Sequence, residues 1–165
     1  MLILAQTLSQ LRFLDLMSVY EEGNRENAAC FYLEMDSGAA LILAEQDFYT
    51  YLTEVFFCTK GATYAVWEVS GKYVAALRFE PFQDGELLEA LETAPDERGK
   101  GYAQALVNAA LQTRRGPVYS HIKKTNIASL CVHEKCGFVH HCNFAHCIDG
   151  TIDKEMLTLR YDHLN

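Results

Sequence analysis

The spacing of apolar residues divides the chain into a helix-rich first third and a strand-rich remainder. Near the start, Thr7 and Gln10 form a capping-box pair. Apolar residues then recur on one helical face as far as the glycine at position 23, at Leu8, Leu11, Leu14 and Met17. A second helix is predicted to end near residues 60–61, from the three-, four- and seven-residue spacing of Phe48, Tyr51, Leu52 and Val55. The apolar run at 39–44 between them fits a helix or a strand.

From residue 62 the apolar period changes from helical spacing to two. Alternating segments cover 62–69, 72–82 and 86–95. Asp84-Gly85 separates the second from the third and is a strong tight-turn signal, while Ser70-Gly71 is a weaker one. The three segments therefore predict an antiparallel meander.

The rest of the chain alternates helices with strands. Small and large apolar residues predict a helix over 99 to about 114, and PVYSHI after it predicts a short strand. Strand, helix, strand in that order implies a right-handed crossover between parallel strands. Asn126 is then predicted to cap a helix that runs to Cys136 and closes at Gly137, and FVHHCNFAHC and KEMLTLRY are predicted as the last strands. The sequence thus predicts one mixed α/β domain spanning 1–165.

Composition narrows the classes of partner. The 165 residues are half apolar, which suits a domain that folds alone. Twenty-two acidic against fourteen basic residues give a net charge of −8, so we expect no nucleic-acid partner. The N-terminal segment lacks the pattern of a secretion signal, and no apolar run is long enough for a membrane span. We therefore expect a cytoplasmic protein with no membrane partner.

Cysteine and histidine residues cluster near the C-terminus and raise the question of a zinc site. They are Cys131, His133, Cys136, His140, His141, Cys142, His146 and Cys147. Structural zinc sites use ligand pairs two to four residues apart, whereas the two cysteine pairs here each enclose four residues and have no matching partner pair. We expect reduced thiols and no metal, and a zinc-stabilised interaction domain is the weakest of the functional hypotheses.

Residues 98–103 form the segment best suited to hold phosphate. Two glycines one residue apart leave backbone N–H groups unshielded, and the predicted helix that follows directs its free amides and positive dipole end at an anion. A Walker loop is excluded because Lys100 precedes Gly101 instead of Ser or Thr. A dinucleotide fingerprint is excluded because Gln104 stands where a small residue is needed. The remaining alternative is a plain turn.

Two motifs in this frame resemble those of the GCN5-related N-acetyltransferase (GNAT) family. The first is Arg or Gln, two residues, Gly, one residue, Gly or Ala, which Arg98, Gly101 and Ala103 match. The second begins at Asn126 and ends with HEKCGF at 133–138, in which His133 replaces the family's tyrosine. The resemblance covers roughly the last 100 residues. It implies a mixed, mainly antiparallel central sheet flanked by helices, with a parallel pair of strands that splay apart at the cofactor site.

The resemblance also implies where acetyl-CoA binds. Its pyrophosphate would lie on the backbone amides of the glycine loop, formed by Arg98, Gly99, Lys100, Gly101, Tyr102 and Ala103. The pantetheine arm would pair with the preceding strand near Leu91 and Thr93, and Asn126 would contact the cofactor from the other side. A plain helix cap is the alternative role for Asn126.

Acetyl transfer to an amine requires a group that removes a proton from an ammonium and one that supplies a proton to a thiolate. His133, in the place of the family's tyrosine, is the candidate acid, and the alternative is that it merely fills a surface position. The candidate bases are His121 and, on the strand before the loop, Glu92 or Glu89, with ordered water as the alternative. Strand alternation predicts that Glu89 and Glu92 face opposite sides of the sheet, and we favour Glu92.

The sequence therefore predicts an N-acetyltransferase that moves an acetyl group from acetyl-CoA to an amine of a small molecule or peptide by direct attack in a ternary complex. Residues 1–60 would recognise the acceptor, and 62–160 would form the acetyl-CoA-binding core. The alternative is a catalytically weak CoA-binding sensor or assembly module of the same fold, suggested by the missing tyrosine. Proteins that this sequence resembles are often homodimers, so a homodimer is a possible assembly.

Overall fold

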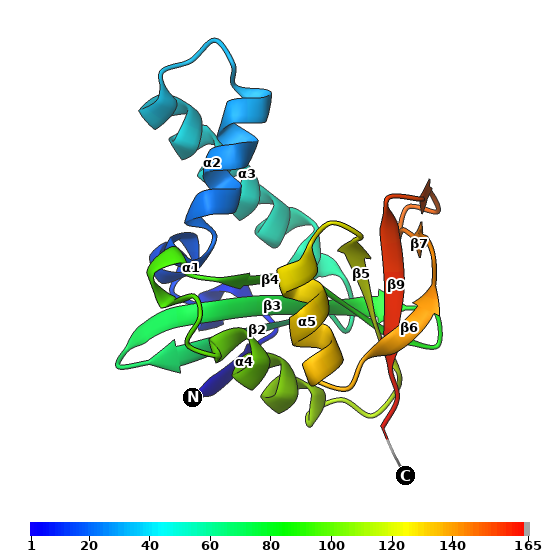
Figure 1. Ribbon diagram of the computed structural model, residues 1–165. Coiled ribbons are helices and arrows are strands. Elements are labelled where there is room, and N and C mark those ends of the chain that lie inside the picture. Colours follow the sequence, from blue (N-terminus) through cyan, green and yellow to red (C-terminus); the bar gives the residue numbers. More distant parts are fainter. Residues whose placement is uncertain (164–165) are drawn as a thin grey trace.

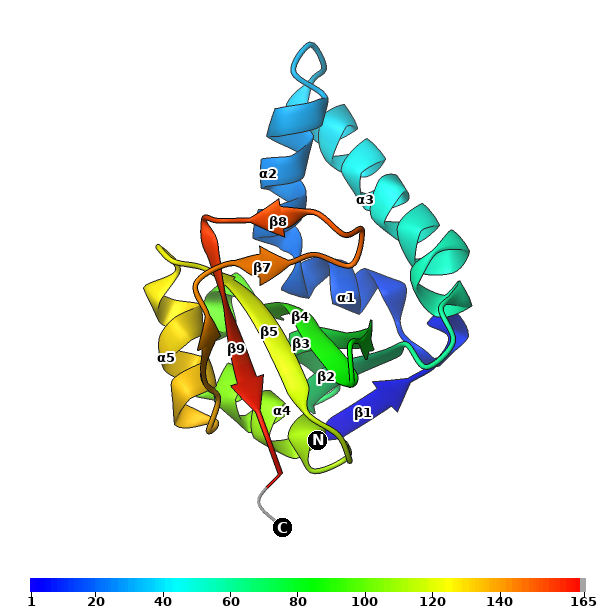
Figure 2. The same ribbon diagram turned by 90° about the vertical axis from the view of Figure 1, so that its right-hand side faces the viewer.

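The computed structural model describes residues 1–163. Seven strands form one sheet in the order β1-β2-β3-β4-β5-β9-β6, and every neighbouring pair is antiparallel except β4 and β5. Figures 1 and 2 show this sheet between two groups of helices, so the predicted mixed α/β fold with one parallel pair is confirmed.

The bounds of the elements follow the predicted pattern from β2 onward. The strands are β1 (Leu2–Ala5), β2 (Thr63–Val69), β3 (Lys72–Phe82), β4 (Gly85–Thr93), β5 (Val118–Lys123), β6 (Val139–Cys142), β7 (Ala145–His146), β8 (Ile152–Asp153) and β9 (Met156–Tyr161). The helices are α1 (Phe13–Val19), α2 (Glu21–Phe31), α3 (Ser37–Glu54), α4 (Tyr102–Leu111) and α5 (Ile127–Lys135), with single 3₁₀ turns η1 (Leu8–Gln10), η2 (Phe56–Cys58) and η3 (Pro95–Glu97).

The first predicted helix is wrong in its extent. The capping box is present, since the Gln10 side chain accepts hydrogen bonds from the backbone N–H groups of Gln6 and Thr7, but it caps only the turn η1. The chain then becomes extended at Leu11, and helical structure resumes in α1 and continues through Gly23 in α2. The predicted apolar face is therefore divided between η1 and α1 by extended backbone at Leu11. The ambiguous run at 39–44 lies inside α3.

Each face of the sheet has its own apolar core. Helices α4 and α5 cover one face, where Leu77, Phe79, Leu88, Leu106, Val118 and Leu159 are buried. On the opposite face, α1 and the C-terminal part of α3 cover Leu16, Tyr20, Leu52, Phe56, Tyr64 and Ala76. The other ends of α2 and α3 form a hairpin that projects away from the sheet (Figures 1 and 2). Within residues 1–163, no helix has the length and apolar character to cross a bilayer.

The turn between β3 and β4 differs from the predicted turn by one residue. Phe82 pairs with Gly85, so Gln83 and Asp84 form the two-residue turn, with Gln83 at a φ of +50°. Gly85 is needed for a different reason, because a Cβ there would lie 2.0 Å from the carbonyl oxygen of Pro117. This close approach brings the start of β4 against the start of β5.

Replacing Gly85 with alanine tests this packing. We expect Gly85→Ala to lower the free energy of unfolding by about 1–3 kcal/mol, the usual cost of overpacking, because backbone must move to admit the methyl group. Gly23→Ala is the matched control, since Gly23 lies inside α2 with open space where its Cβ would be. This change should stabilise the protein by about 0.5–1 kcal/mol. Urea denaturation measures both, and an unchanged midpoint for Gly85→Ala would contradict the close contact.

Candidate functional site

The two parallel strands separate after three paired positions. β4 pairs with β5 from Glu86 opposite Val118 to Leu88 opposite Ser120, and the rest of β5 pairs only with β9. From Glu89 to Thr93, β4 therefore presents an edge with no strand beside it. The Ala94 N–H donates to Val74 on β3, so strand alternation directs the backbone groups of Thr93 away from β3 and toward the gap.

The predicted pantetheine contacts lie on this free edge. Leu91 and Thr93 are two residues apart, so their backbone groups share the edge that faces the gap. The Thr93 carbonyl already accepts a hydrogen bond from Arg98 Nε at 3.3 Å. An unpaired strand edge can accept an extended ligand as an additional strand, which is the geometry that an amide-containing arm requires.

A β-bulge interrupts β4 beside the gap. Arg78 pairs with Glu89 and Ala76 pairs with Glu92, so Ala90 and Leu91 together lie opposite Leu77 on β3. Ala90 has a φ of +51°, and its carbonyl accepts a hydrogen bond of 2.7 Å from the Tyr20 hydroxyl.

The bulge makes the predicted alternation of Glu89 and Glu92 wrong. Their partners on β3, Arg78 and Ala76, are two residues apart and share a face. The extra residue in β4 therefore places both carboxylates on the same face, that of α1 and α3. Either carboxylate can face an acceptor that enters from this side.

The glycine loop has the predicted backbone form. Gly99 and Gly101 have φ angles of +76° and +83°, with open space where each Cβ would be. Gly101 is the N-cap of α4, so the N–H groups of the first turn, from Tyr102 and Ala103 onward, have no partner within the helix. The loop and the helix together form a site for an anion.

The two basic side chains of the loop contribute less positive charge than the sequence indicates. Arg98 forms an ion pair with Glu22 on α2 and lies 3.9 Å from Glu92, and Lys100 Nζ lies 2.8 Å from Glu97. Each cation is thus matched by a carboxylate. Attraction for phosphate depends mainly on the backbone amides and the dipole of α4.

Asn126 is a helix cap in the structure. Its side-chain oxygen accepts a hydrogen bond from the Ser129 N–H at 3.1 Å, at the start of α5. The side chain is exposed, so a cofactor contact in addition to the cap remains a proposal.

His133 lies on α5 and is 1% exposed. Its Nδ1 is 2.8 Å from the Ser129 carbonyl oxygen, which only accepts hydrogen bonds, so Nδ1 carries the proton in the neutral ring. Nε2 is then unprotonated, and it is buried without a hydrogen-bond partner among the described residues. Burial also lowers the pKa of His133. The resting side chain therefore accepts a proton before it can donate one.

His121 and the carboxylates of β3 and β4 lie on the opposite face. His121 packs edge-on against Phe82 at 5.2 Å, its Nε2 is buried without a partner among residues 1–163, and burial lowers its pKa, against the opposing effect of nearby Glu89. Burial raises the pKa of Glu92, which Arg98 partly counters. The structure thus brings His121 and Glu89 together, while Glu92 lies nearer the glycine loop.

Sequence reasoning missed two charged residues at this face, Arg78 and Glu80. Both are enclosed, with Glu80 only 8% exposed and the Arg78 side chain 17% exposed. Alternation in β3 could have found them, since it places both on the face of Ala76. A charged pair in a strand whose neighbours are apolar is a signal of a polar site in a core.

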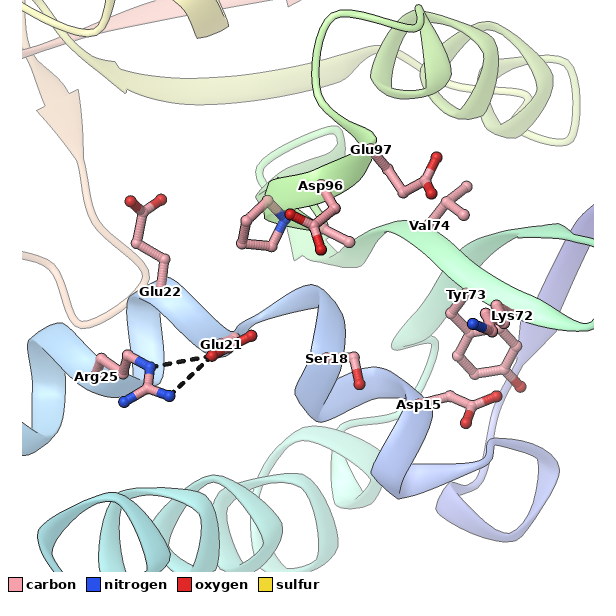
Figure 3. Close-up of a pocket in the computed structure, with 12 residues that line it drawn as sticks. Asp15, Ser18, Glu21, Glu22, Arg25, Lys72, Tyr73, Val74, Asp96 and Glu97 are labelled. Atoms are coloured by element: carbon pink, nitrogen blue, oxygen red, sulfur yellow. Dashed lines mark hydrogen bonds and ion pairs between the residues drawn. The ribbon is translucent and has the colours of Figure 1, made fainter. Parts of the chain in front are cut away.

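A pocket of about 760 Å³ lies beside the glycine loop (Figure 3). Its walls come from α1 and α2, from the segment through η3 and from the start of β3. Two cations, Arg25 and Lys72, line the pocket together with five carboxylates. The carboxylates are Asp15, Glu21, Glu22, Asp96 and Glu97. Its lining contains no residue of β5, so the pocket lies apart from the gap between β4 and β5.

The cysteines and histidines near the C-terminus do not gather into a site. Among the described residues, no group of three or more His, Cys, Asp or Glu side chains is placed to hold a metal ion. All six cysteines are free thiols, with Cys136 buried and Cys131 exposed.

The fold is similar to that of several solved structures that are named as acetyltransferases. PaiA N-acetyltransferase from Thermoplasma acidophilum, in complex with coenzyme A, matches with a TM-score of 0.64 at 12% identity over 99% of each chain. A ribosomal-protein-alanine N-acetyltransferase from Brucella melitensis matches with a TM-score of 0.60 at 18% identity over 99% of each chain. A variant of the spermidine N-acetyltransferase SpeG from Vibrio cholerae matches with a TM-score of 0.61 at 18% identity, over 98% of this chain and 94% of its own.

Comparison by sequence finds a family model but no individual curated protein. No curated protein matches the chain. The family model of the Acetyltransferase (GNAT) family matches residues 20–138, which include the bulged strand, the glycine loop and α5. The chain therefore belongs to the GNAT acetyltransferase family.

Proposed function

We propose that the protein is an N-acetyltransferase that uses acetyl-CoA to acetylate an amine of a small molecule or peptide, by direct attack in a ternary complex. The observation that carries the proposal is the combination of a free β4 edge with a glycine loop and the amide end of α4. Similar folds bear names of amine acetyltransferases, and one is a complex with coenzyme A. Acetyl-CoA supplies a thioester, from which an amine can take the acetyl group.

The residues of this chain fit coenzyme A at three points. The backbone amides of residues 98–103 would hold the pyrophosphate. The backbone groups of Leu91 and Thr93, on the strand edge without a partner strand, would pair with the pantetheine amides, with the Thr93 carbonyl also accepting from Arg98 Nε. Asn126 would contact the cofactor from α5. These assignments require only backbone groups and one exposed amide, which the geometry leaves accessible.

The acceptor is expected to enter on the face of α1 and α3, where Glu89, Glu92 and His121 lie. Carboxylates on this face would attract a cationic amine and can take a proton from it. His121 is neutral near neutral pH because burial lowers its pKa, so it too can accept a proton. We propose these side chains as the source of the general base.

The change Gly101→Ala tests the glycine loop. A methyl group at a φ of +83° strains the backbone by about 1–2 kcal/mol and occupies the open side of the amide cradle, so we expect coenzyme A to bind about tenfold more weakly by calorimetry. Gly150→Ala is the matched control, with a φ of +85° and open space in the β7–β8 hairpin. It should leave the affinity unchanged. Equal affinities for both variants would contradict the loop assignment.

The role of His133 can be tested with two variants of nearly equal size. We propose His133 as the group that protonates the departing thiolate after it gains a proton itself. Because burial lowers its folded-state pKa, the protonated form is lost as pH rises through a value below the ordinary 6.5. Turnover limited by this step should therefore fall above that pH.

In His133→Phe no proton donor remains, whereas His133→Tyr supplies a phenol that stays protonated to about pH 10. At pH 8 we expect His133→Tyr to turn over at least tenfold faster than His133→Phe, with coenzyme A binding equal in the two. Thiol release with a panel of polyamines, aminoglycosides, amino acids and peptides measures both. Equal rates for the two variants would rule out the acid role.

The second candidate function is a CoA-binding sensor, which the neutral, buried His133 favours. Its signature is tight binding of coenzyme A without thiol release from acetyl-CoA for any amine of the same panel. If His133→Tyr then restores thiol release, the chain has lost only the acid.

A further inference from the structure

Two glutamates from adjacent strands lie on the same face at the point where β4 and β5 separate. Glu80 is on β3 and Glu89 on β4, and the pairing of Arg78 with Glu89 and of Glu80 with Leu87 places them diagonally across the ladder. Glu89 directly follows Leu88, the last residue of β4 that pairs with β5. Both carboxylates therefore lie at the inner end of the gap.

The cation Arg78 lies near both acids. Arg78 Nε lies 2.6 Å from Glu89 Oε1, and the guanidinium is covered by the ring of Tyr51, with its central carbon 4.8 Å from the ring centroid. A single guanidinium cannot neutralise two carboxylates. Burial and the nearness of Glu89 raise the pKa of Glu80 to about 7. The two acids thus hold one proton between them near neutral pH, as paired carboxylates do at close range.

Among residues 1–163, the side chains that face the pair from other elements add no second positive charge. Tyr51 faces the pair from α3, Tyr20 lies near Glu89 at the α1–α2 junction, and Tyr64 of β2 lies opposite Arg78. Burial raises the pKa of each tyrosine, so all three stay neutral. His121 faces Glu89 from β5, with His146 of β7 near it, and burial lowers the pKa of His121. Within the part of the chain that the structure describes, Arg78 is the cation whose charge opposes the raised pKa of Glu80.

The two acids differ in access. The Glu89 side chain is 27% exposed, whereas Glu80 as a residue is 8% exposed. Glu89 can therefore contact an acceptor at the gap, and Glu80 can act only through Glu89. Glu92 is on the same face but faces Arg98, Glu22 and Glu26 near the glycine loop.

We propose that Glu80 and Glu89 act as one proton-accepting pair, in which Glu89 contacts the acceptor ammonium and Glu80 is a positioning residue that holds the proton behind it. This inference deepens the proposed acetyltransferase function and rests on it. When the pair has released its own proton to solvent, the N–H bond of the ammonium breaks, its electron pair stays on nitrogen, and the proton forms an O–H bond on the carboxylate pair. The proton then leaves to solvent, and the neutral amine is free to attack.

The pairing sets the strength of the base. An isolated glutamate near pKa 4.3 is too weak to take a proton from an ammonium efficiently at neutral pH, whereas a base near pH 7 is well matched. Within the pair, Glu80 is the carboxylate whose pKa, raised to about 7 by burial and the nearness of Glu89, suits a base at neutral pH. Removal of Glu80 should therefore weaken the base without removing it.

The first test is independent of activity. Carboxyl carbons of glutamate in the ligand-free protein are titrated by NMR, and we expect one glutamate signal with a midpoint near pH 7. In Glu80→Gln this signal should disappear. A wild-type protein with no glutamate titrating above pH 6 would contradict the pair, even if the variant failed to fold.

The second test uses the pH profile of kcat/KM with one amine acceptor. At low pH kcat/KM falls because the base is protonated, and in Glu80→Gln this acidic limb of the profile should move to lower pH by more than one unit. Glu89→Gln should lower kcat by about 10²–10⁴. Glu86→Gln, also on β4 but paired with Arg114, should leave the limb in place. An acidic limb unmoved by Glu80→Gln contradicts the pair alone, whereas no turnover of any amine contradicts the proposed function itself.

Discussion

The separation of β4 from β5 is the constraint on which the site depends. Backbone groups in a sheet need partners, and an unpaired stretch inside a domain is costly unless water or a ligand satisfies it. Two features set where the strands meet and where they separate. The close approach of Gly85 to Pro117 fixes the start of the pair, and β9 pairs with the whole of β5 and so holds it away from the free part of β4.

The bulge at Ala90 connects this gap to the acceptor side. A regular strand would have put Glu89 and Glu92 on opposite faces, and only one could then meet an acceptor. With the bulge, both carboxylates join Arg78 on one face, and the Tyr20 hydroxyl binds the bulged carbonyl from the α1–α2 junction. The same irregularity thus lies beside the edge that suits a cofactor and assembles the acids that suit a cationic amine.

Features encoded by a few neighbouring residues could be predicted from the sequence, and features set by packing could not. The glycine loop and the Asn126 cap are local, so the residues alone indicated their backbone form. The bulge carries no such signal, because alanine with a φ of +51° is held there by contacts with β3 and Tyr20. The division of the first helix at Leu11 likewise follows from how α1 packs on the sheet, and the ion pairs of Arg98 and Lys100 from where α2 and η3 lie.

In the proposed site the cofactor is held mainly by backbone groups, and such a site tolerates change in sequence. The similar structures share only 12–18% identity with this chain, yet they cover nearly all of it. A phosphate held by N–H groups and an arm paired with a strand edge require a backbone path, a few glycines and little else. Acid–base groups are under no such restriction, since a proton can be moved by imidazole, carboxylate or phenol of suitable pKa. The replacement of tyrosine by His133 and the buried pair of Glu80 and Glu89 are therefore the places where this chain is expected to differ most from other family members.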